Sequence, residues 1–178
     1  ASWSLAMVLV TQIGGLVQTA VASTAAAGRD SSIGVASVAA AAIAWLIFML
    51  PHSVVTVSVA TAYFTRMSQH AAKCEMQSFK SDLTNGLKVI ALVSVISSAL
   101  LTLLAYPIAR VFAGEYPANI ALGNVIMALM IGLVPFSFVY MMQRAFFALE
   151  DTRTPFVFTS IQIAFHIAGS IALGATMP

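Results

Sequence analysis

Charged residues gather in one short stretch of the chain, residues 143–155, with the sequence QRAFFALEDTRTP. Only 8% of the 178 residues are charged. The charged residues of this stretch are Arg144, Glu150, Asp151 and Arg153. An arginine and a carboxylate can form an ion pair, and an aspartate or threonine before a helix can accept hydrogen bonds from its first amides. Thr154-Pro155 suits a helix start, because proline is favoured in the first turn.

Two interpretations of this stretch are compatible with the sequence. In the first it is a tied helical hairpin, in which Asp151 or Thr152 caps the next helix and Arg144 pairs with Asp151 or Glu150. In the second the same turn is also a cytoplasmic gate of a transport cycle. The gate candidates are Arg144, Asp151, Arg153, Thr154 and Pro155.

Polar residues inside the apolar segments form a second set of candidates. His52 adjoins Pro51, and His166 lies in the last apolar segment. Each histidine either titrates near neutral pH or stays neutral and bonds to a neighbouring helix. Small and polar stripes either tie helices together or line a polar cavity. The cavity-lining candidates are Gln18, His52, Ser58 and Thr61.

The chain carries no pattern that indicates an enzyme. It has no phosphate-binding glycine loop, no HExxH and no plausible nucleophile triad. His70 and Cys74 stand four positions apart, but two ligands make a weak metal site and chance adjacency explains them better. We therefore expect neither enzymatic activity nor a metal or cofactor. The centres of the apolar segments also lack Asp, Glu, Lys and Arg, which argues against a proton pump or voltage sensor built from them alone.

The elements that position these residues are set by hydrophobicity. Hydrophobic residues make up 60% of the chain, and a soluble fold of this size could not cover its surface with so few charges. We predict an all-α, polytopic transmembrane bundle without strands. Membrane-spanning helices of about 20 residues are expected in five segments. These segments are about 3–26, 33–65, 87–106, 120–142 and 155–175.

The second segment is too long for one straight crossing. At about 1.5 Å per residue its helix reaches about 50 Å, against a hydrocarbon core of about 30 Å. Pro51 lies near its middle, so we expect one helix bent at that point. The following stretch, MSQHAAKCEMQSFKSDL, has apolar residues at helical spacing on one face. It indicates a cytoplasmic amphipathic helix on the membrane surface, with a solvated loop as the alternative.

The basic residues predict the orientation. Of the eight Lys and Arg, Arg29 and Arg110 flank odd-numbered loops and the other six flank even-numbered loops. The positive-inside rule places the even loops and the N-terminus in the cytoplasm, and five crossings place the C-terminus outside. The chain begins with Ala1 and ends just after an apolar run, so we expect residues 1–178 to be one transmembrane region of a larger transporter.

Two motifs resemble the MurJ/MviN family of lipid II flippases, within the multidrug/oligosaccharidyl-lipid/polysaccharide exporter superfamily. They are LPHSVVTVSVATAYFTRMS, residues 50–68, and QRAFFALEDTRTP. The matching positions are Pro51, Ser58, Thr61, Arg66, Arg144, Phe146, Ala148, Asp151, Thr152, Thr154 and Pro155. The resemblance covers essentially the whole chain and corresponds to about the seventh to eleventh of the family's helices.

The resemblance implies a bacterial protein of the cytoplasmic (inner) membrane. It implies alternating access, with lipid II and membrane lipids as partners together with the rest of the transporter. The net charge of +2 is too small to indicate a nucleic-acid partner. The alternatives are another exporter of the superfamily, for a drug or a polyprenyl-linked glycan, or a non-transporting membrane scaffold. One departure stands out: the window AAIAWLIFMLP lacks the basic residue that many relatives carry before the proline. We therefore expect a pyrophosphate to be bound by cationic residues in the rest of the transporter.

Overall fold

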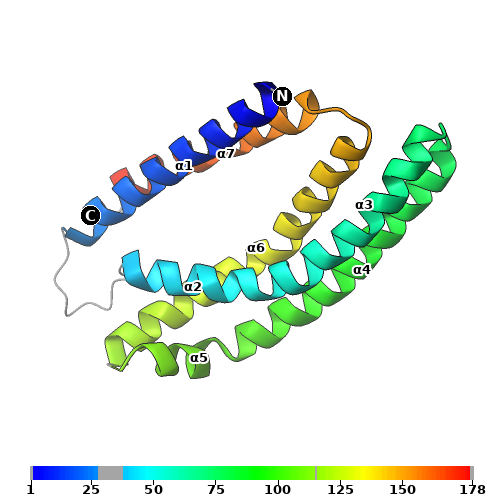
Figure 1. The fold of residues 1–178 in the computed structure, drawn as a ribbon. Helices are drawn as coiled ribbons and strands as arrows, with labels where there is room; N and C mark the ends of the chain where they lie inside the picture. Colours follow the sequence, from blue (N-terminus) through cyan, green and yellow to red (C-terminus); the bar gives the residue numbers. More distant parts are fainter. Residues whose placement is uncertain (1, 28–37, 115, 177–178) are drawn as a thin grey trace.

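The structure is a computed structural model that describes residues 2–27, 38–114 and 116–176. Within those residues it is an assembly of helices with no strand, which confirms the all-α class (Figure 1). The elements in chain order are α1 (Ser2–Ala27), α2 (Val38–Pro51), the π-helical turn η1 (His52–Thr56), α3 (Val57–Ala72), α4 (Met76–Leu103), α5 (Ala105–Phe112), α6 (Tyr116–Ala148) and α7 (Arg153–Thr176).

Three helical stretches of the described residues are long and apolar enough to cross a membrane. They are Val38–Ala72, Met76–Leu103 and Tyr116–Ala148. Each exceeds the predicted segment at the end that the basic residues predict to be cytoplasmic, because polar turns continue the helix beyond its apolar part. The first and last predicted segments correspond to α1 and α7. Within α1, the apolar stretch Leu5–Val17 is shorter than the three spanning stretches. Five crossings therefore stay a prediction where α1 and α7 are concerned.

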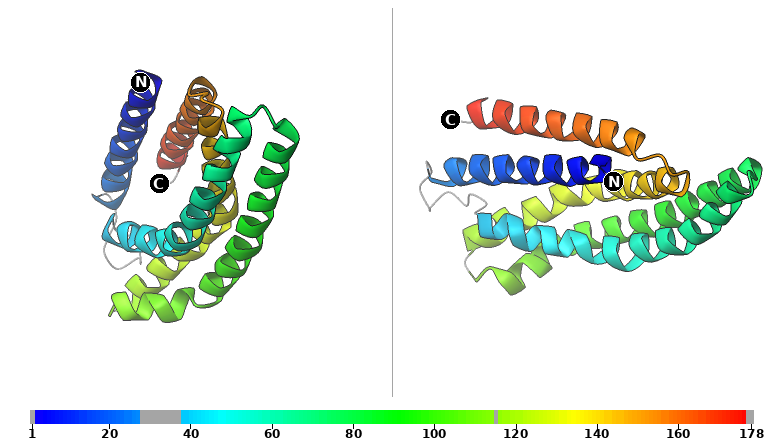
Figure 2. Two further views of the ribbon diagram at one scale, coloured as in Figure 1. Left: turned by 45° about the vertical axis from the view of Figure 1, so that its right-hand side comes forward. Right: turned by 45° about the horizontal axis from the view of Figure 1, so that its top comes forward.

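The predicted bend at Pro51 is present. The helix continues through Pro51, but the next turn widens to π geometry, in which the Val57 amide donates to the His52 carbonyl. Proline offers no amide hydrogen and its ring crowds the preceding turn, so the backbone must rearrange around it. The Ser53 hydroxyl donates to the Leu50 carbonyl at 3.1 Å. As a result α2 and α3 run in clearly different directions (Figures 1 and 2).

The amphipathic stretch is helical, but it lies differently from the expectation. Its residues 67–72 are the end of α3, residues 73–75 form the turn, and the residues from Met76 onward form the first turns of α4. Helix α4 continues without a break into the apolar part and packs along α3, so the stretch is a helical hairpin and not a single helix on the surface. Phe79 is buried against α3 residues such as Met67. The predicted third segment also divides: α4 ends at Leu103, and Pro107 belongs to the short helix α5.

Helix α6 is the element around which α2 to α5 pack. One buried cluster joins α2, α5 and the first half of α6, with Phe48, Ala109 and Ile126 among its members. A second joins α3, α4 and the last part of α6, with Met67 and Met141 among its members. The two clusters therefore occupy opposite halves of one helix and hold α2 to α6 together.

Helices α1 and α7 form a separate pair. They pack along each other over much of their length, whereas α1 touches α2 and α7 touches α6 only slightly (Figure 2). The two helices approach closely at Gly14, where a Cβ would lie 2.9 Å from Cγ2 of Ile163. The α1–α7 pair is thus joined to the α2–α6 unit mainly through the chain itself.

The two tight turns of the described chain share one backbone device. Cys74 and Glu150 have φ angles of 58° and 59°. After α3, the Glu75 amide bonds to the His70 carbonyl, and after α6 the Asp151 amide bonds to the Phe146 carbonyl. Both turns are Schellman motifs in which a residue other than glycine occupies the left-handed position.

We predict that Cys74→Gly stabilises the protein. A left-handed conformation costs an L-residue about 1–2 kcal/mol. Glycine avoids this cost, but its greater freedom in the unfolded chain offsets part of the gain in stability. The expected gain is about 1 kcal/mol or less, measured as a rise in melting temperature of the detergent-solubilised protein. Cys74→Val, with a branched Cβ, should lower it. Equal melting temperatures for the glycine and valine variants would show that the turn carries no strain.

Candidate functional site

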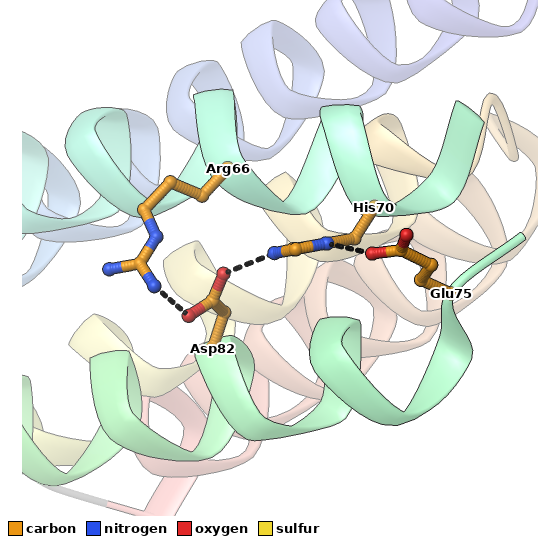
Figure 3. A network of polar contacts seen from close by, with 4 residues as sticks. All are labelled: Arg66, His70, Glu75 and Asp82. Atoms are coloured by element: carbon orange, nitrogen blue, oxygen red, sulfur yellow. Dashed lines mark hydrogen bonds and ion pairs between the residues drawn. The ribbon is translucent and has the colours of Figure 1, made fainter. Parts of the chain in front are cut away.

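Four charged or titratable side chains meet where α3 lies against the start of α4. Arg66 Nη2 lies 2.9 Å from Asp82 Oδ1. His70 stands between two carboxylates, with Nδ1 2.8 Å from Glu75 Oε2 and Nε2 3.3 Å from Asp82 Oδ2. Figure 3 shows the row, with Arg66 and His70 on α3 and Asp82 facing them from α4. We call this row the hairpin network.

Asp82 is the centre of the hairpin network because it alone is buried. Its side chain is 6% exposed, whereas that of Arg66 is 62% exposed. Oδ2 of Asp82 makes no hydrogen bond within the described residues, and His70 Nε2 lies 3.3 Å from it. A buried carboxylate needs such partners, since removing it from water is costly. The pairing therefore fixes α4 against α3.

The network borders an open pocket of about 460 Å³ on the surface of the hairpin. Its lining residues are Arg66, His70, Gln77, Ser78, Ser81 and Asp82. Sequence reasoning did not find this site: it used Arg66 for orientation and as a position of the family motif, and it weighed His70 only as a metal ligand. The available signal was spacing, because Arg66 and His70 are four residues apart on one face of a helix. The central residue of the network, Asp82, is the only aspartate in the amphipathic stretch, residues 67–83.

Arg144 in the 143–155 turn has different partners from those expected. Arg144 donates to the Tyr140 hydroxyl at 2.7 Å and lies over the rings of Phe64 and Tyr140, 5.8 and 5.2 Å from their centres. Because Phe64 belongs to α3, its cation–π contact with Arg144 joins α6 to α3. Asp151 turns instead toward the start of α7. The expected Arg144–Asp151 pair is thus replaced by two separate sets of contacts.

Asp151 caps helix α7, as one sequence interpretation predicted. Its Oδ1 accepts hydrogen bonds from the amides of Arg153 and Thr154 at 2.9 and 3.2 Å, and its Oδ2 accepts one from the Thr154 hydroxyl at 2.6 Å. The Thr154 hydroxyl, followed by the two amides and the nearby Arg153 charge, lowers the pKa of Asp151. Pro155 is fully buried in the first turn of α7. The left-handed Glu150 gives the chain the direction that this cap requires.

His52 belongs to a buried polar cluster at the bend. The Thr56 hydroxyl donates to Ser137 Oγ at 3.1 Å, and His52 Nδ1 lies 3.4 Å from the same oxygen. All three side chains are buried. The His52 ring also packs against Phe136 and Tyr140, with ring centroids 4.7 and 5.2 Å apart. This matches the interpretation in which the histidine bonds to a neighbouring helix.

The remaining candidates are not gathered into this cluster. Ser58 and Thr61 are exposed, and the Thr61 hydroxyl donates to the Val57 carbonyl of its own helix at 2.7 Å. His166 is exposed on α7. The side chain of Gln18 lies outside the described residues. A cavity lined by these positions stays a prediction.

Comparison with known proteins supplies the family. A family model described as "Lipid II flippase MurJ" matches residues 1–178. A protein of Rhizobium meliloti (strain 1021), named probable lipid II flippase MurJ, is 26% identical over 168 residues, which are 92% of this chain and 30% of that protein. One of Borreliella burgdorferi with the same name is 24% identical over 147 residues, covering 78% of this chain and 29% of that protein. The chain thus spans about 30% of the relatives' length, and no solved structure matches it.

The Asp151 cap generates a pH prediction. Its pKa is lowered on folding, so the cap stabilises the protein above the ordinary aspartate pKa of about 4 and is lost as pH falls through the lowered value. Asp151→Ala should therefore lower the melting temperature at pH 7. The difference in melting temperature between wild type and Asp151→Ala should narrow toward pH 3. Asp151→Asn keeps one acceptor oxygen, so its melting temperature at pH 7 should lie between those of wild type and Asp151→Ala. A gap of constant size from pH 7 to pH 3 would contradict the charged cap.

Proposed function

The chain belongs to the lipid II flippase MurJ family, and from that premise we propose that it is part of a bacterial transporter of lipid II. The observation that carries the proposal is the match of the family model to residues 1–178. Helices long and apolar enough to span a membrane support it. The transporter moves lipid II across the cytoplasmic membrane by alternating access and is not an enzyme. The hairpin network faces the cytoplasm, as the basic loops predict.

We propose a division of work between two parts of the chain. Helices α2 to α6 form one body, because α6 is packed by both buried clusters and tied to the bend by Ser137. Arg144 and Asp82 add ties at the cytoplasmic end. The α1–α7 pair has few contacts with that body. Alternating access requires two parts that move against each other, and the lightly packed boundary is the place for this motion.

In this proposal the hairpin network transmits motion and does not bind substrate. Asp82 makes α3 and α4 a stiff cytoplasmic lever, which continues through the bend into the membrane. The membrane-embedded middles of the described helices hold no Lys or Arg to pair with a pyrophosphate. These residues therefore serve as wall and lever, and phosphate recognition lies elsewhere in the transporter.

The test is complementation in cells depleted of the complete transporter that carries these residues. Depletion should make lipid II accumulate in the inner leaflet, and the wild-type gene should reverse this. Asp82→Ala leaves Arg66 without its partner, at an expected stability cost of about 1–2 kcal/mol once the exposure of Arg66 is discounted. We expect normal membrane levels but at least about a tenfold loss of flipping. Glu75→Gln, at the exposed end of the network, is the matched control.

Two results would contradict the proposal at different levels. Accumulation of another lipid-linked precursor, with lipid II distributed normally, would overturn the substrate. Full activity of Asp82→Ala with lipid II still accumulating on depletion would overturn the lever alone. If both Asp82→Ala and Glu75→Gln lose activity equally, the burial of Asp82 is not what matters.

A further inference from the structure

A second pocket is lined by residues of α5 and the start of α6. These two elements lie at the opposite end of the bundle from the turn between α3 and α4 (Figure 1). The pocket has a volume of about 620 Å³, within the range of small-molecule sites. Its lining residues are Tyr106, Pro107, Arg110, Tyr116, Asn119 and Ile120. Neither the fold nor the proposed function uses these side chains.

Asn119 is the residue that points to a ligand. It is only 6% exposed, and its Oδ1 has no hydrogen-bond partner among the described residues. An unpaired buried carbonyl costs about 1–3 kcal/mol, so native structures rarely keep one without a reason. Asn119 also lines the pocket, so a bound group with a hydrogen to donate would satisfy it.

Tyr106 forms a rigid wall of the pocket. Its ring lies against Gly123 so closely that a Cβ there would be 2.6 Å from Cδ1. Its hydroxyl donates to Asn124 Oδ1 at 2.9 Å, so its hydrogen is already used. The ring is therefore held by α6 on two sides, and the wall exists before any ligand binds.

Arg110 and the apolar residues around it indicate two further features of the ligand, an anionic group and an apolar part. Arg110 is an exposed cation that suits a phosphate. Around it the surface is apolar: Leu103, Val111 and Phe112 are 78%, 80% and 56% exposed. A short helix with one strongly apolar face and tyrosines at its edge is typical of a membrane interface. The ligand thus combines an anion, a hydrogen donor and an apolar part.

We propose that this pocket binds the headgroup of an anionic glycerophospholipid that carries free hydroxyl groups. The phosphodiester pairs with Arg110, a headgroup hydroxyl donates to Asn119, and the acyl chains lie along the apolar face of α5. By the predicted orientation this lipid belongs to the outer leaflet. The proposal does not depend on which substrate the transporter moves.

The test measures lipid affinity by native mass spectrometry of the complete transporter. Phosphatidylglycerol carries both the charge and the hydroxyls, phosphatidylmethanol carries only the charge, and phosphatidylcholine carries neither net charge nor hydroxyl. We expect phosphatidylglycerol to bind about tenfold more tightly than phosphatidylmethanol, the value of one good hydrogen bond. Phosphatidylcholine should bind more weakly still. Free glycerol 3-phosphate should not compete at the same concentration.

The variants separate the two contacts. Arg110→Gln should weaken the binding of both anionic lipids about tenfold. The control is Lys80→Gln, which removes an exposed cation on α4 and should leave both affinities unchanged. Asn119→Leu should abolish the preference for phosphatidylglycerol over phosphatidylmethanol. It should also keep or raise the melting temperature, because an unpaired buried amide is replaced by an apolar group of similar size.

Three results would overturn the proposal. One is equal affinity of the wild type for phosphatidylglycerol and phosphatidylmethanol. Another is unchanged phosphatidylglycerol affinity in Arg110→Gln, which is exposed and expected to fold. The third is a fall in melting temperature for Asn119→Leu together with an intact lipid preference in Asn119→Ala, which would make Asn119 a structural residue.

Discussion

The meeting of Ser137 with the turn after Pro51 is the contact on which the arrangement of the described helices depends. A proline inside a membrane helix removes a backbone donor that no water can replace. This chain answers with a π turn, His52–Thr56, and fastens that turn to α6 through one serine hydroxyl. Without that tie the bend would be a flexible point in a long helix. With it the direction of α3 relative to α6 is fixed.

The fixed bend explains why the same helix can hold two buried clusters. On one side of Ser137, α6 packs against α2 and α5 through residues such as Ile126; on the other it packs against α3 and α4 through residues such as Met141. A straight helix from α2 to α3 could follow only one of these surfaces. The bend therefore converts three long helices into one body, beside which α1 and α7 form a lightly attached pair.

The sequence predicted what local rules control. Pro51 indicated the bend, the apolar segments indicated the helices, and Asp151 before Thr154-Pro155 indicated a cap. It did not predict the π turn, because the widening depends on how the surrounding helices take up the extra residue. It also missed Asp82, whose partners come from another helix. The expected pairing of Arg144 with Asp151 failed for a similar reason: the left-handed Glu150 turns Asp151 toward α7, while Tyr140 and Phe64 take the arginine.

In the proposed transport cycle α2 to α6 move as one body, and α1 and α7 move against it. Double electron–electron resonance in the complete transporter, in a Cys74→Ser background, tests this motion most directly. One spin-label pair, Lys80→Cys with Ile131→Cys, lies within the body, and another, Lys80→Cys with Phe165→Cys, joins it to α7; all three sites are exposed. On addition of lipid II the first distance distribution should stay unchanged while the second shifts. A shift of the first pair as large as that of the second would show that α2 to α6 do not move as one body.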